Sequence, residues 1–381
     1  MSLSKSNKKG ILLPPAVGYS FKILVNLIRR NKIHIKYYPR ILAIVIINLI
    51  NFPFRAYERL IINPRFKKRP IITEPIFIIG HWRSGTTHLH NLLCQDAQMG
   101  YVTTYQSVFP DTLYNKIGRF LFKGFSVLLI PGKREGDNVI LGPSLPQEEE
   151  FALGDKIPIS FYYFWMFPKN ILKYYDQFIR FENVNSETKT LWQAHYKLLI
   201  KKALKNTNRP VFLSKNPPNT ARIKVLLEMF PQAKFIHIHR NPIEVFLSTQ
   251  NFYKKMLPYL QLQNISQDEI DRNILHIYKN LMKDFFEQKD LIPAGNLTEL
   301  SFEELESDTL YSLGKIYKEL NLKGIEKALP EFKIYIESTV NYKKNKHKIS
   351  KSLLDILLKE WSFAMEKLKY EIPKNVEIID E

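Results

Sequence analysis

Between residues 71 and 250, short apolar runs alternate with segments whose apolar residues recur at helical spacing. Three such runs are Ile76–Ile79, Val211–Leu213 and Phe235–His239. Runs of this length and composition are typical of strands buried on both faces of a parallel sheet. The alternation therefore predicts an α/β fold in which helices flank a central parallel sheet.

The pattern changes on either side of that region. Residues 111–175 are rich in aromatic residues and predict an irregular insertion over the substrate, and "ISFYYFWMFP" within it suits a hydrophobic acceptor. Residues 266–290 return to a helical pattern, and "NLTELSFEEL" predicts a strand that leads into a further helix. We expect a division into an N-terminal helical region, residues 1–70, and a main domain, residues 71–381.

The N-terminal region contains the most apolar stretch of the chain, "ILAIVIINLINFPF", which includes Asn48 and Asn51. It is shorter than the roughly 20 apolar residues that span a bilayer. Basic residues precede it at Arg29, Arg30, Lys32, Lys36 and Arg40. The pattern leaves two interpretations open: residues 20–65 contact a membrane interface peripherally, or the stretch is a buried helix of the N-terminal annex.

Composition narrows the class of protein. The 381 residues are 45% hydrophobic and carry a net charge of +19, which favours polyanionic small molecules, nucleic acid or an anionic membrane as partners. We find no nucleic-acid-binding signature. The single cysteine, Cys94, excludes an internal disulfide, and the start of the chain lacks the pattern of a cleaved signal peptide. We expect a cytoplasmic protein, peripheral at the inner membrane surface if the N-terminal region binds there.

The strongest chemical signal is the segment "PIFIIGHWRSGTTHLHNLL". Gly80 and Gly85 bracket a loop between a strand and a helix, where backbone N–H groups and the helix dipole favour phosphate or sulfate. A nucleotide kinase needs lysine after the second glycine, but Thr86 stands there and Arg83 lies inside the loop. The loop therefore predicts an anion-binding site that is a poor match for a magnesium triphosphate.

Two further cations follow predicted strands. Lys215 ends the run that begins at Val211, and Arg240 follows the run that ends at His239. Ligands in open α/β sheets bind beyond the carboxyl ends of the strands. We therefore expect Arg83, Lys215 and Arg240 to converge at one edge of the sheet.

These residues resemble the motifs of sulfotransferases that use 3′-phosphoadenosine 5′-phosphosulfate (PAPS). "HWRSGTTHL" is similar to the family's 5′-phosphosulfate loop, and Arg240 with Ser248, eight residues later, is similar to its 3′-phosphate motif. "PQEEEFAL", from Pro146 to Leu153, resembles a bacterial branch with the pattern P-x-E-[DE]-E-F-A-L. The resemblance covers about residues 70–310 and implies a P-loop-like, three-layer fold.

The resemblance also implies roles. The 5′-phosphate would bind Ser84, Gly85, Thr86 and Thr87, and the 3′-phosphate would bind Arg240 and Ser248. Arg83 would neutralise charge on the bridging oxygen as the bond breaks, and Lys215 would lie near the sulfonyl group. PAPS is then the cosubstrate and 3′-phosphoadenosine 5′-phosphate (PAP) the product, and no metal is required.

The chain departs from the family at its general base. Many cytosolic members have a catalytic histidine two residues after the strand-end lysine, but here Pro217 follows Lys215 and Asn216. The acids of "PQEEEF" are the candidates, and the resemblance favours Glu148 and Glu150 over Glu149 as the base. The alternative is an acidic helix N-terminus without a catalytic role.

Six other positions carry predictions. His88 either stacks on adenine or is simply packed, and Phe302 either lies beside adenine or is a core residue. The family's late R-K-G motif is missing, and Lys343 and Lys344 of "YKKNKHK" are candidates to replace it. His237 and His239 are expected to be a satisfied pair in the sheet.

The leading function is therefore a sulfotransferase acting on a hydroxyl of a hydrophobic acceptor such as a sterol or lipid. Two alternatives remain open at this point. One is a P-loop kinase or NTPase, and the other is a non-catalytic basic protein that binds nucleic acid or membrane.

Overall fold

The computed structural model describes residues 15–129, 140–339 and 347–380. The chain divides into two compact units, each built from three segments. The first unit comprises Met1–Ile72, Tyr101–Asn208 and Phe252–Gln267, and the second comprises Thr73–Gly100, Arg209–Asn251 and Asp268–Glu381. The division expected at residue 70 stays a prediction.

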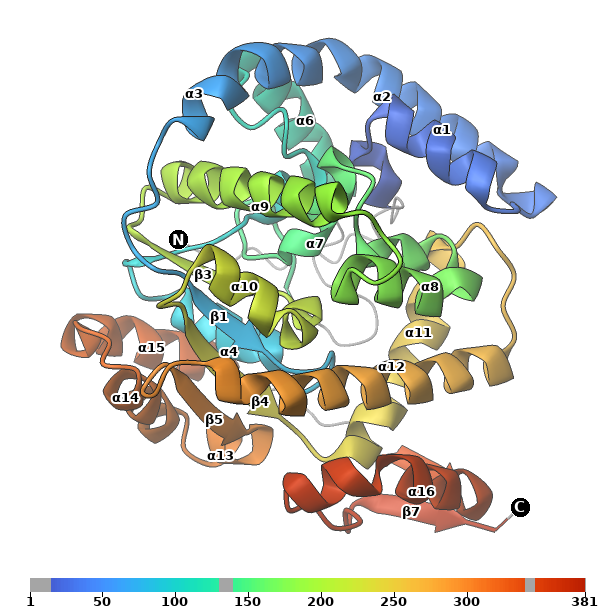
Figure 1. Ribbon diagram of the computed structural model, residues 1–381, viewed down its shortest axis with the longest axis vertical. Helices are drawn as coiled ribbons and strands as arrows, with labels where there is room; N and C mark the ends of the chain where they lie inside the picture. The colour runs from blue at the N-terminus through green and yellow to red at the C-terminus, as the bar shows by residue number, and fades with distance from the viewer. Residues whose placement is uncertain (1–14, 130–139, 340–346, 381) are drawn as a thin grey trace. The chain divides into compact units, whose positions relative to one another are not determined.

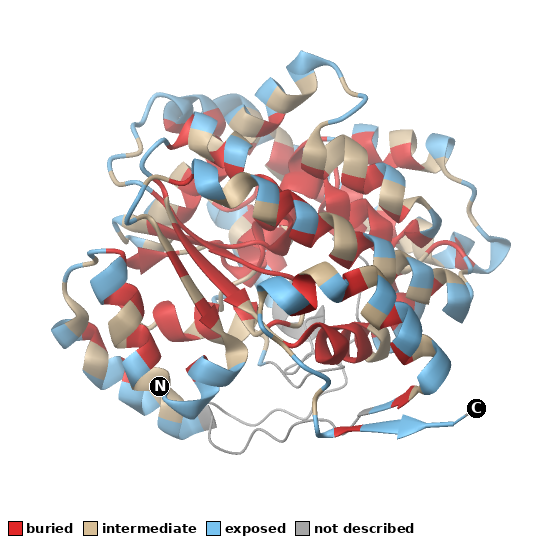
Figure 2. Ribbon diagram, turned by 60° about the horizontal axis from the view of Figure 1, so that its bottom comes forward, coloured by how far each residue is buried: buried red, intermediate tan, exposed pale blue. Residues whose placement is uncertain are grey.

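The second unit contains the central sheet (Figure 1). Its five parallel strands lie in the order β2-β3-β1-β4-β5. They are β1 (Ile76–Ile79), β2 (Met99–Gly100), β3 (Val211–Lys215), β4 (Lys234–His239) and β5 (Leu297–Ser301). Every residue of β1 is buried, and Figure 2 shows the strands largely in the colour of buried residues. The parallel sheet and the strand predictions are confirmed.

Helices of the second unit connect and cover these strands. They are α4 (Thr86–Leu93), α10 (Ile223–Met229), α12 (Gln267–Gln288), α13 (Phe302–Ser307), α14 (Thr309–Glu319), α15 (Ile325–Thr339) and α16 (Lys351–Lys367), with the short helices η7 (Pro217–Ala221) and η8 (Lys289–Leu291). Helix α11 (Pro242–Leu260) follows β4. A separate pair of parallel strands, β6 (His347–Ser350) and β7 (Val376–Ile379), lies near the C-terminus.

The described residues of the first unit form helices joined by loops, with an isolated bridge between Thr103 and Pro146. Its α-helices are α1 (Phe21–Arg30), α2 (Tyr38–Tyr57), α3 (Asn63–Lys67), α5 (Thr104–Val108), α6 (Lys116–Leu129), α7 (Glu149–Lys156), α8 (Ile171–Tyr175) and α9 (Ser186–Thr207). The short helices are η1 (Pro15–Gly18), η2 (Ile35–Tyr37), η3 (Glu58–Ile62), η4 (Phe161–Trp165), η5 (Pro168–Asn170) and η6 (Asp176–Arg180). The expectation of an irregular segment over residues 111–175 is wrong where α6, α7 and α8 form regular helices. Residues 130–139 lie outside the described residues, and the expected position over the substrate stays a prediction.

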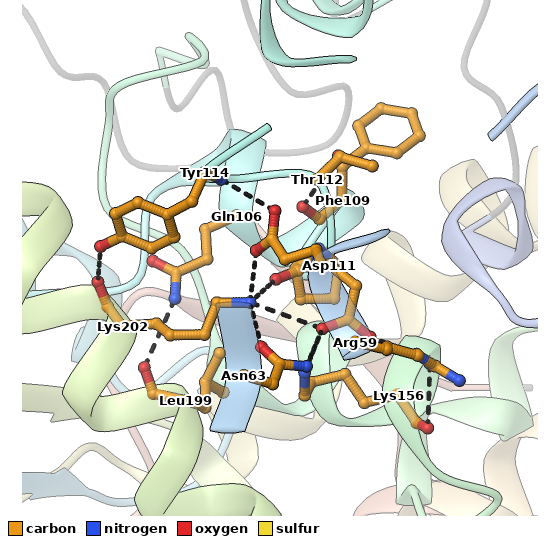
Figure 3. Close-up of polar contacts among 12 residues, drawn as sticks. Arg59, Asn63, Gln106, Phe109, Asp111, Thr112, Tyr114, Lys156, Leu199 and Lys202 are labelled. Atoms are coloured by element: carbon orange, nitrogen blue, oxygen red, sulfur yellow. Dashed lines mark hydrogen bonds and ion pairs between the residues drawn. The ribbon is translucent and has the colours of Figure 1, made fainter. Parts of the chain in front are cut away.

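A buried ionic cluster joins several of these helices (Figure 3). Lys202 on α9 lies 2.6 Å from Glu58 and 3.4 Å from Asp111, and all three side chains are almost fully buried. Asp111 also pairs with Lys156 and with Arg59, the latter at 2.6 Å. These cations hold the pKa of Asp111 well below its usual range, although burial alone would raise it. Sequence reasoning missed this cluster, because its members are far apart in the chain.

The apolar N-terminal stretch also belongs to the first unit, and the structure shows how far it is buried. Ile35–Lys67 forms a continuous helical stretch that, by length and composition only, could cross a membrane. Only 28% of its 18-residue apolar segment is buried. The buried-helix interpretation is therefore wrong, because many of the apolar side chains of α2 are exposed.

Candidate active site

The loop between β1 and α4 has a backbone that glycine makes possible. Gly80 has a φ of 141°, and a Cβ there would lie 2.2 Å from the carbonyl oxygen of Ile238 on β4. Gly85 has a φ of 91° and is the N-cap residue of α4. Arg83, between them, also adopts a left-handed φ, of 71°. The loop is therefore held in a conformation that most residues avoid, as is frequent at ligand-binding sites.

Helix α4 begins directly after this loop. The first hydrogen bond of the helix runs from the N–H of Leu89 to the carbonyl of Gly85. The backbone N–H groups before Leu89 therefore have no acceptor within the helix. The hydroxyls of Ser84, Thr86 and Thr87 lie at the same helix end, and Ser84 and Thr86 are buried. Such a concentration of N–H and O–H donors suits a phosphate group.

Lys215 reaches the loop from the neighbouring strand. It is the last residue of β3, it pairs in register with Ile78 of β1, and it is 1% exposed. Its ammonium group donates to the hydroxyl of Thr87 at 3.3 Å. Burial, reinforced by the charge of Lys215, lowers the pKa of His90 on α4 well below its usual value. Of these two side chains, Lys215 therefore provides the positive charge beside the loop, because the lowered pKa keeps His90 uncharged at neutral pH.

Arg83 points toward the motif that follows β4. Its Nε donates to the hydroxyl of Ser248 on α11 at 3.0 Å. This contact joins the two segments whose resemblance to the 5′- and 3′-phosphate motifs was noted separately.

Arg240 completes the group of cations. Its Nε donates to Glu244 at 2.9 Å, and its guanidinium lies over the ring of Phe302, 4.9 Å from the ring centre. A Cβ on Gly85 would lie 2.3 Å from that ring, so Phe302 packs directly against the loop. Among the described residues, Arg240 makes no other hydrogen bond or ion pair, so its terminal amino groups are available to an anion.

The predicted convergence is thus present in the second unit. Contacts with Ser248, Thr87 and Phe302 bring Arg83, Lys215 and Arg240 around one loop. Phe302 is only half-buried and packs on this loop, so it is not an ordinary core residue. The arrangement fits an anion with two separated phosphate groups, one at the helix terminus and one near Arg240 and Ser248.

The other candidate residues lie at different places in the second unit or outside the described residues. His88 is half-buried on α4, and burial lowers its pKa. His237 and His239 have partners, Glu299 and the hydroxyl of Tyr370, each at 2.9 Å. Lys343 and Lys344 lie outside the described residues.

The acidic candidates belong to the first unit, at the start of α7. Glu148 is the N-cap residue and accepts a short hydrogen bond from the hydroxyl of Tyr162. Glu150 accepts a hydrogen bond from the backbone N–H of Phe161 at 2.8 Å. All three acids, Glu149 included, are buried. The three acids therefore lie at a helix N-terminus, and the two candidate bases have different partners. A catalytic role for either stays a prediction.

Sequence reasoning missed three positioning residues. Thr220 accepts a hydrogen bond from the N–H of Gly80 at 2.8 Å, Glu244 orients Arg240, and Tyr162 holds Glu148. Only Glu244 carried a readable signal, because it is an acid four residues after Arg240 in the first turn of the helix that follows β4.

Comparison with known proteins identifies the family to which this chain is similar. The sequence pattern of the Sulfotransferase family matches residues 75–127 and 159–326, which is more than half of the chain. Relatives from Mycobacterium bovis and Mycobacterium tuberculosis, both named omega-hydroxy-beta-dihydromenaquinone-9 sulfotransferase Stf3, are 29% identical over 360 residues. That alignment covers 94% of this chain and 92% of each relative.

Two solved structures show the same fold. Sulfotransferase STF9 from Mycobacterium avium superposes with a TM-score of 0.65 at 17% identity, covering 84% of this chain and 82% of its own. Sulfotransferase STF1 from Mycobacterium tuberculosis superposes with a TM-score of 0.66 at 14% identity, covering 90% of both chains. At such identities the likeness concerns the fold alone.

Proposed function

Because the chain belongs to the sulfotransferase family, and is therefore an enzyme of that class, we propose that it transfers the sulfonyl group of PAPS to a hydroxyl of a lipid-like acceptor. Family membership removes the kinase and the non-catalytic binding protein from the candidates. The observation that carries the proposal is the grouping of Arg83, Lys215 and Arg240 around the loop that opens α4.

The two phosphate groups of the donor would bind at two separate parts of this site. The amides of α4, with the hydroxyls of Ser84, Thr86 and Thr87, hold the 5′-phosphate. Arg240 and Ser248 hold the 3′-phosphate, which suits the planar donor fork of a guanidinium. Phe302, already packed on Gly85 and beneath Arg240, offers the remaining apolar surface to the adenine.

The reaction breaks the bond between sulfur and the oxygen that bridges it to the 5′-phosphate. It forms a bond between sulfur and the acceptor oxygen, whose proton passes to a base. Negative charge therefore grows on the bridging oxygen, which stays with PAP. Arg83 and Lys215 stabilise that charge, so positioning and electrostatics supply most of the catalysis.

We assign the base to Glu148 and a positioning role to Glu150. One carboxylate oxygen of Glu150 accepts a hydrogen bond from the backbone N–H of Phe161, which links α7 to η4. Glu148 is bound instead by the hydroxyl of Tyr162, a group that can rotate and orient the carboxylate toward an acceptor.

The lipid-like acceptor is proposed on two grounds. The mycobacterial relatives are named for a hydroxylated menaquinone, a lipid. The first unit of this chain also carries the aromatic segment η4, whose five residues are buried beside α7. A panel of hydroxylated lipids, sterols, phenols and carbohydrates would identify the acceptor, and turnover of only carbohydrates would overturn the lipid assignment.

Donor binding is tested by thermal unfolding with PAP and, separately, with Mg-ATP. A ligand at 100 times its Kd stabilises the native state by about 2.7 kcal/mol. PAP should raise the Tm and Mg-ATP should raise it less, and Arg240→Met should abolish the PAP effect. A Tm that responds to Mg-ATP but not to PAP would contradict the proposal.

The base is tested by turnover of Glu148→Gln and Glu150→Gln. Loss of a general base lowers kcat by about 10²–10⁴-fold. Glu148→Gln should show this loss with unchanged PAP affinity. Glu150→Gln should keep most of its turnover and lower stability by about 1 kcal/mol, because the amide oxygen of Gln still accepts from the N–H of Phe161 but carries no charge. Unchanged turnover in Glu148→Gln would remove that residue from the mechanism.

A further inference from the structure

Helix α2 and the following helix η3 have their polar residues buried and their apolar residues exposed. The buried positions are Ile44, Asn48, Asn51, Arg55 and Glu58, which recur at helical spacing and form one face. The opposite side exposes large apolar side chains, each more than two-fifths accessible. They are Leu42, Ile46, Leu49, Ile50, Phe52, Tyr57, Leu60 and Ile61. A helix on the surface of a water-soluble protein normally shows the reverse distribution.

Hydrogen bonds fix this orientation. Asn48 donates to the carbonyl of Ala16 at 3.1 Å, and Arg55 donates to the carbonyl of Gly18 at 2.8 Å. Glu58 enters the buried ionic cluster through Lys202. Rotating the helix to bury its apolar side would break these bonds and leave buried charges without partners, so the apolar face is held outward.

Helix α6 extends the exposed apolar area. Phe54 of α2 packs edge-to-face against Phe122, with ring centres 6.0 Å apart, and also lies against Gly118. The helices are drawn side by side in Figure 1. From α6 the apolar side chains of Ile117, Phe120 and Leu121 are exposed, Phe120 to 81%. Together, the exposed apolar residues of α2, η3 and α6 form what we call the apolar face, and contiguous patches of this kind mark interaction sites.

Charges around the apolar face have one sign. Between residues 21 and 73, all of which the structure describes, the only acidic residue is Glu58, and it is fully buried. The basic residues at the two ends of the stretch are exposed. They are Arg29, Arg30, Lys32 and Lys36 before α2, and Arg65, Lys67, Lys68 and Arg69 after η3. An apolar centre between cationic ends is complementary to a bilayer with anionic headgroups.

We propose that the apolar face docks this protein on an anionic lipid surface, with α2 lying in the membrane interface. The 20 residues of α2 make a cylinder about 30 Å long that would rest parallel to the bilayer. The helix does not span the bilayer, because its polar side is bonded within the first unit. This surface lies entirely in the first unit and does not depend on the acceptor being a lipid.

A second copy of the chain fits the apolar face less well. Two copies placed face to face would bring cationic ends together without a carboxylate from residues 21–73 to neutralise them. Like charges brought together across an interface oppose association. A lipid headgroup layer supplies the negative charge that this stretch lacks.

The test is co-sedimentation of the full chain with vesicles of phosphatidylcholine alone or of equal parts phosphatidylcholine and phosphatidylglycerol. The protein should bind the anionic vesicles. Leu49→Gln, Phe52→Gln and Phe120→Gln combined should lower partitioning at least about 100-fold, since each loses an inserted apolar side chain. Lys32→Gln and Lys68→Gln should each lower binding to the anionic vesicles about fivefold.

A matched control combines Leu291→Gln, Tyr311→Gln and Ile334→Gln, which are also exposed apolar residues but belong to the second unit. The control should bind like the wild-type chain, and all variants should keep the wild-type Tm. Three results would each overturn the proposal: no binding of the wild-type chain to anionic vesicles, equal loss of binding in both triple variants, or a dimer that the first triple variant abolishes while vesicle binding is unaffected.

Discussion

Both compact units gather basic side chains, but their partners differ. In the first unit, Lys156 and Lys202 are buried against the carboxylates of Asp111 and Glu58. In the second unit, Arg83 and Lys215 donate to the hydroxyls of Ser248 and Thr87. Arg240 of the second unit also pairs with a carboxylate, that of Glu244, but its three cations are grouped around the N-terminus of α4, whose backbone N–H groups favour an anion. The first group of cations is suited to hold a fold together, and the second to hold an anionic ligand.

This difference separates two kinds of experimental consequence. Removing a cation from the carboxylate-paired cluster leaves a buried negative charge, so stability should fall. Removing a cation from the loop relieves positive charge at a site that has to bind an anion, so binding and turnover should fall instead. Variants in the two groups therefore test whether each cation is structural or functional.

The largest effect is expected from Lys202→Met in the first unit. Breaking a buried ion pair by removing one partner destabilises by about 3–5 kcal/mol, because Glu58 keeps its charge without compensation. Urea unfolding would measure the loss as a lower midpoint. The neighbouring Lys201→Met is the control and should change stability by less than about 0.5 kcal/mol. If Lys202→Met unfolds at the wild-type midpoint, the cluster does not stabilise the fold.

Arg83→Met should have the next largest effect, on turnover. Losing one preorganised group that stabilises developing charge lowers kcat by about 10²–10³-fold. The Tm should stay near the wild-type value, in contrast to Lys202→Met. Steady-state kinetics with PAPS would measure the loss, with the exposed Arg272→Met as a control in the same unit. A stability loss that accounts for the lower turnover would erase the contrast between the two groups.

Acid should destabilise the second unit through His81, which is buried in the loop and 2.7 Å from the carbonyl of Trp82. Burial lowers the pKa of His81 from 6.5 to about 4. Between these values the unfolded chain binds a proton and the folded chain does not, so stability falls as the pH falls from about 6.5 to about 4.

The contribution of His81 is about 1.4 kcal/mol per pH unit in that window. We expect the free energy of unfolding, measured between pH 7 and pH 5, to depend less steeply on pH in His81→Gln than in the wild-type chain. The exposed His276→Gln, in the same unit, should keep the wild-type slope. Identical slopes in both variants would show that His81 is protonated in the fold.

The smallest effect is expected from Phe302→Leu. The change removes the aromatic face beneath Arg240 but keeps an apolar side chain on Gly85. A cation–π contact at a partly exposed site contributes about 0.5–1 kcal/mol, so the KM for PAPS should rise about two- to fivefold with little change in kcat. A change in kcat alone would place Phe302 outside donor binding.

Local patterns predicted the strands of the sheet and the loop around which the three cations lie. The strand–loop–helix at Gly80 and Gly85, and the cations after β3 and β4, follow from short-range signals, and the parallel sheet brings them together. The ionic cluster could not be predicted in this way, because Glu58, Asp111 and Lys202 meet only through helix packing. The orientation of α2 was left open by the sequence, since its apolar content fitted either a membrane interface or burial. In the structure its few polar residues lie on the buried side.

The three-segment construction of each unit has a consequence for synthesis on the ribosome. The first unit includes Phe252–Gln267, so its N-terminal helices cannot complete their packing until well over half of the chain has emerged. Long-range closures of this kind are slow and leave hydrophobic surface exposed in the meantime. The nascent chain, with the apolar stretch near its start, should therefore depend on chaperones until the later segments arrive.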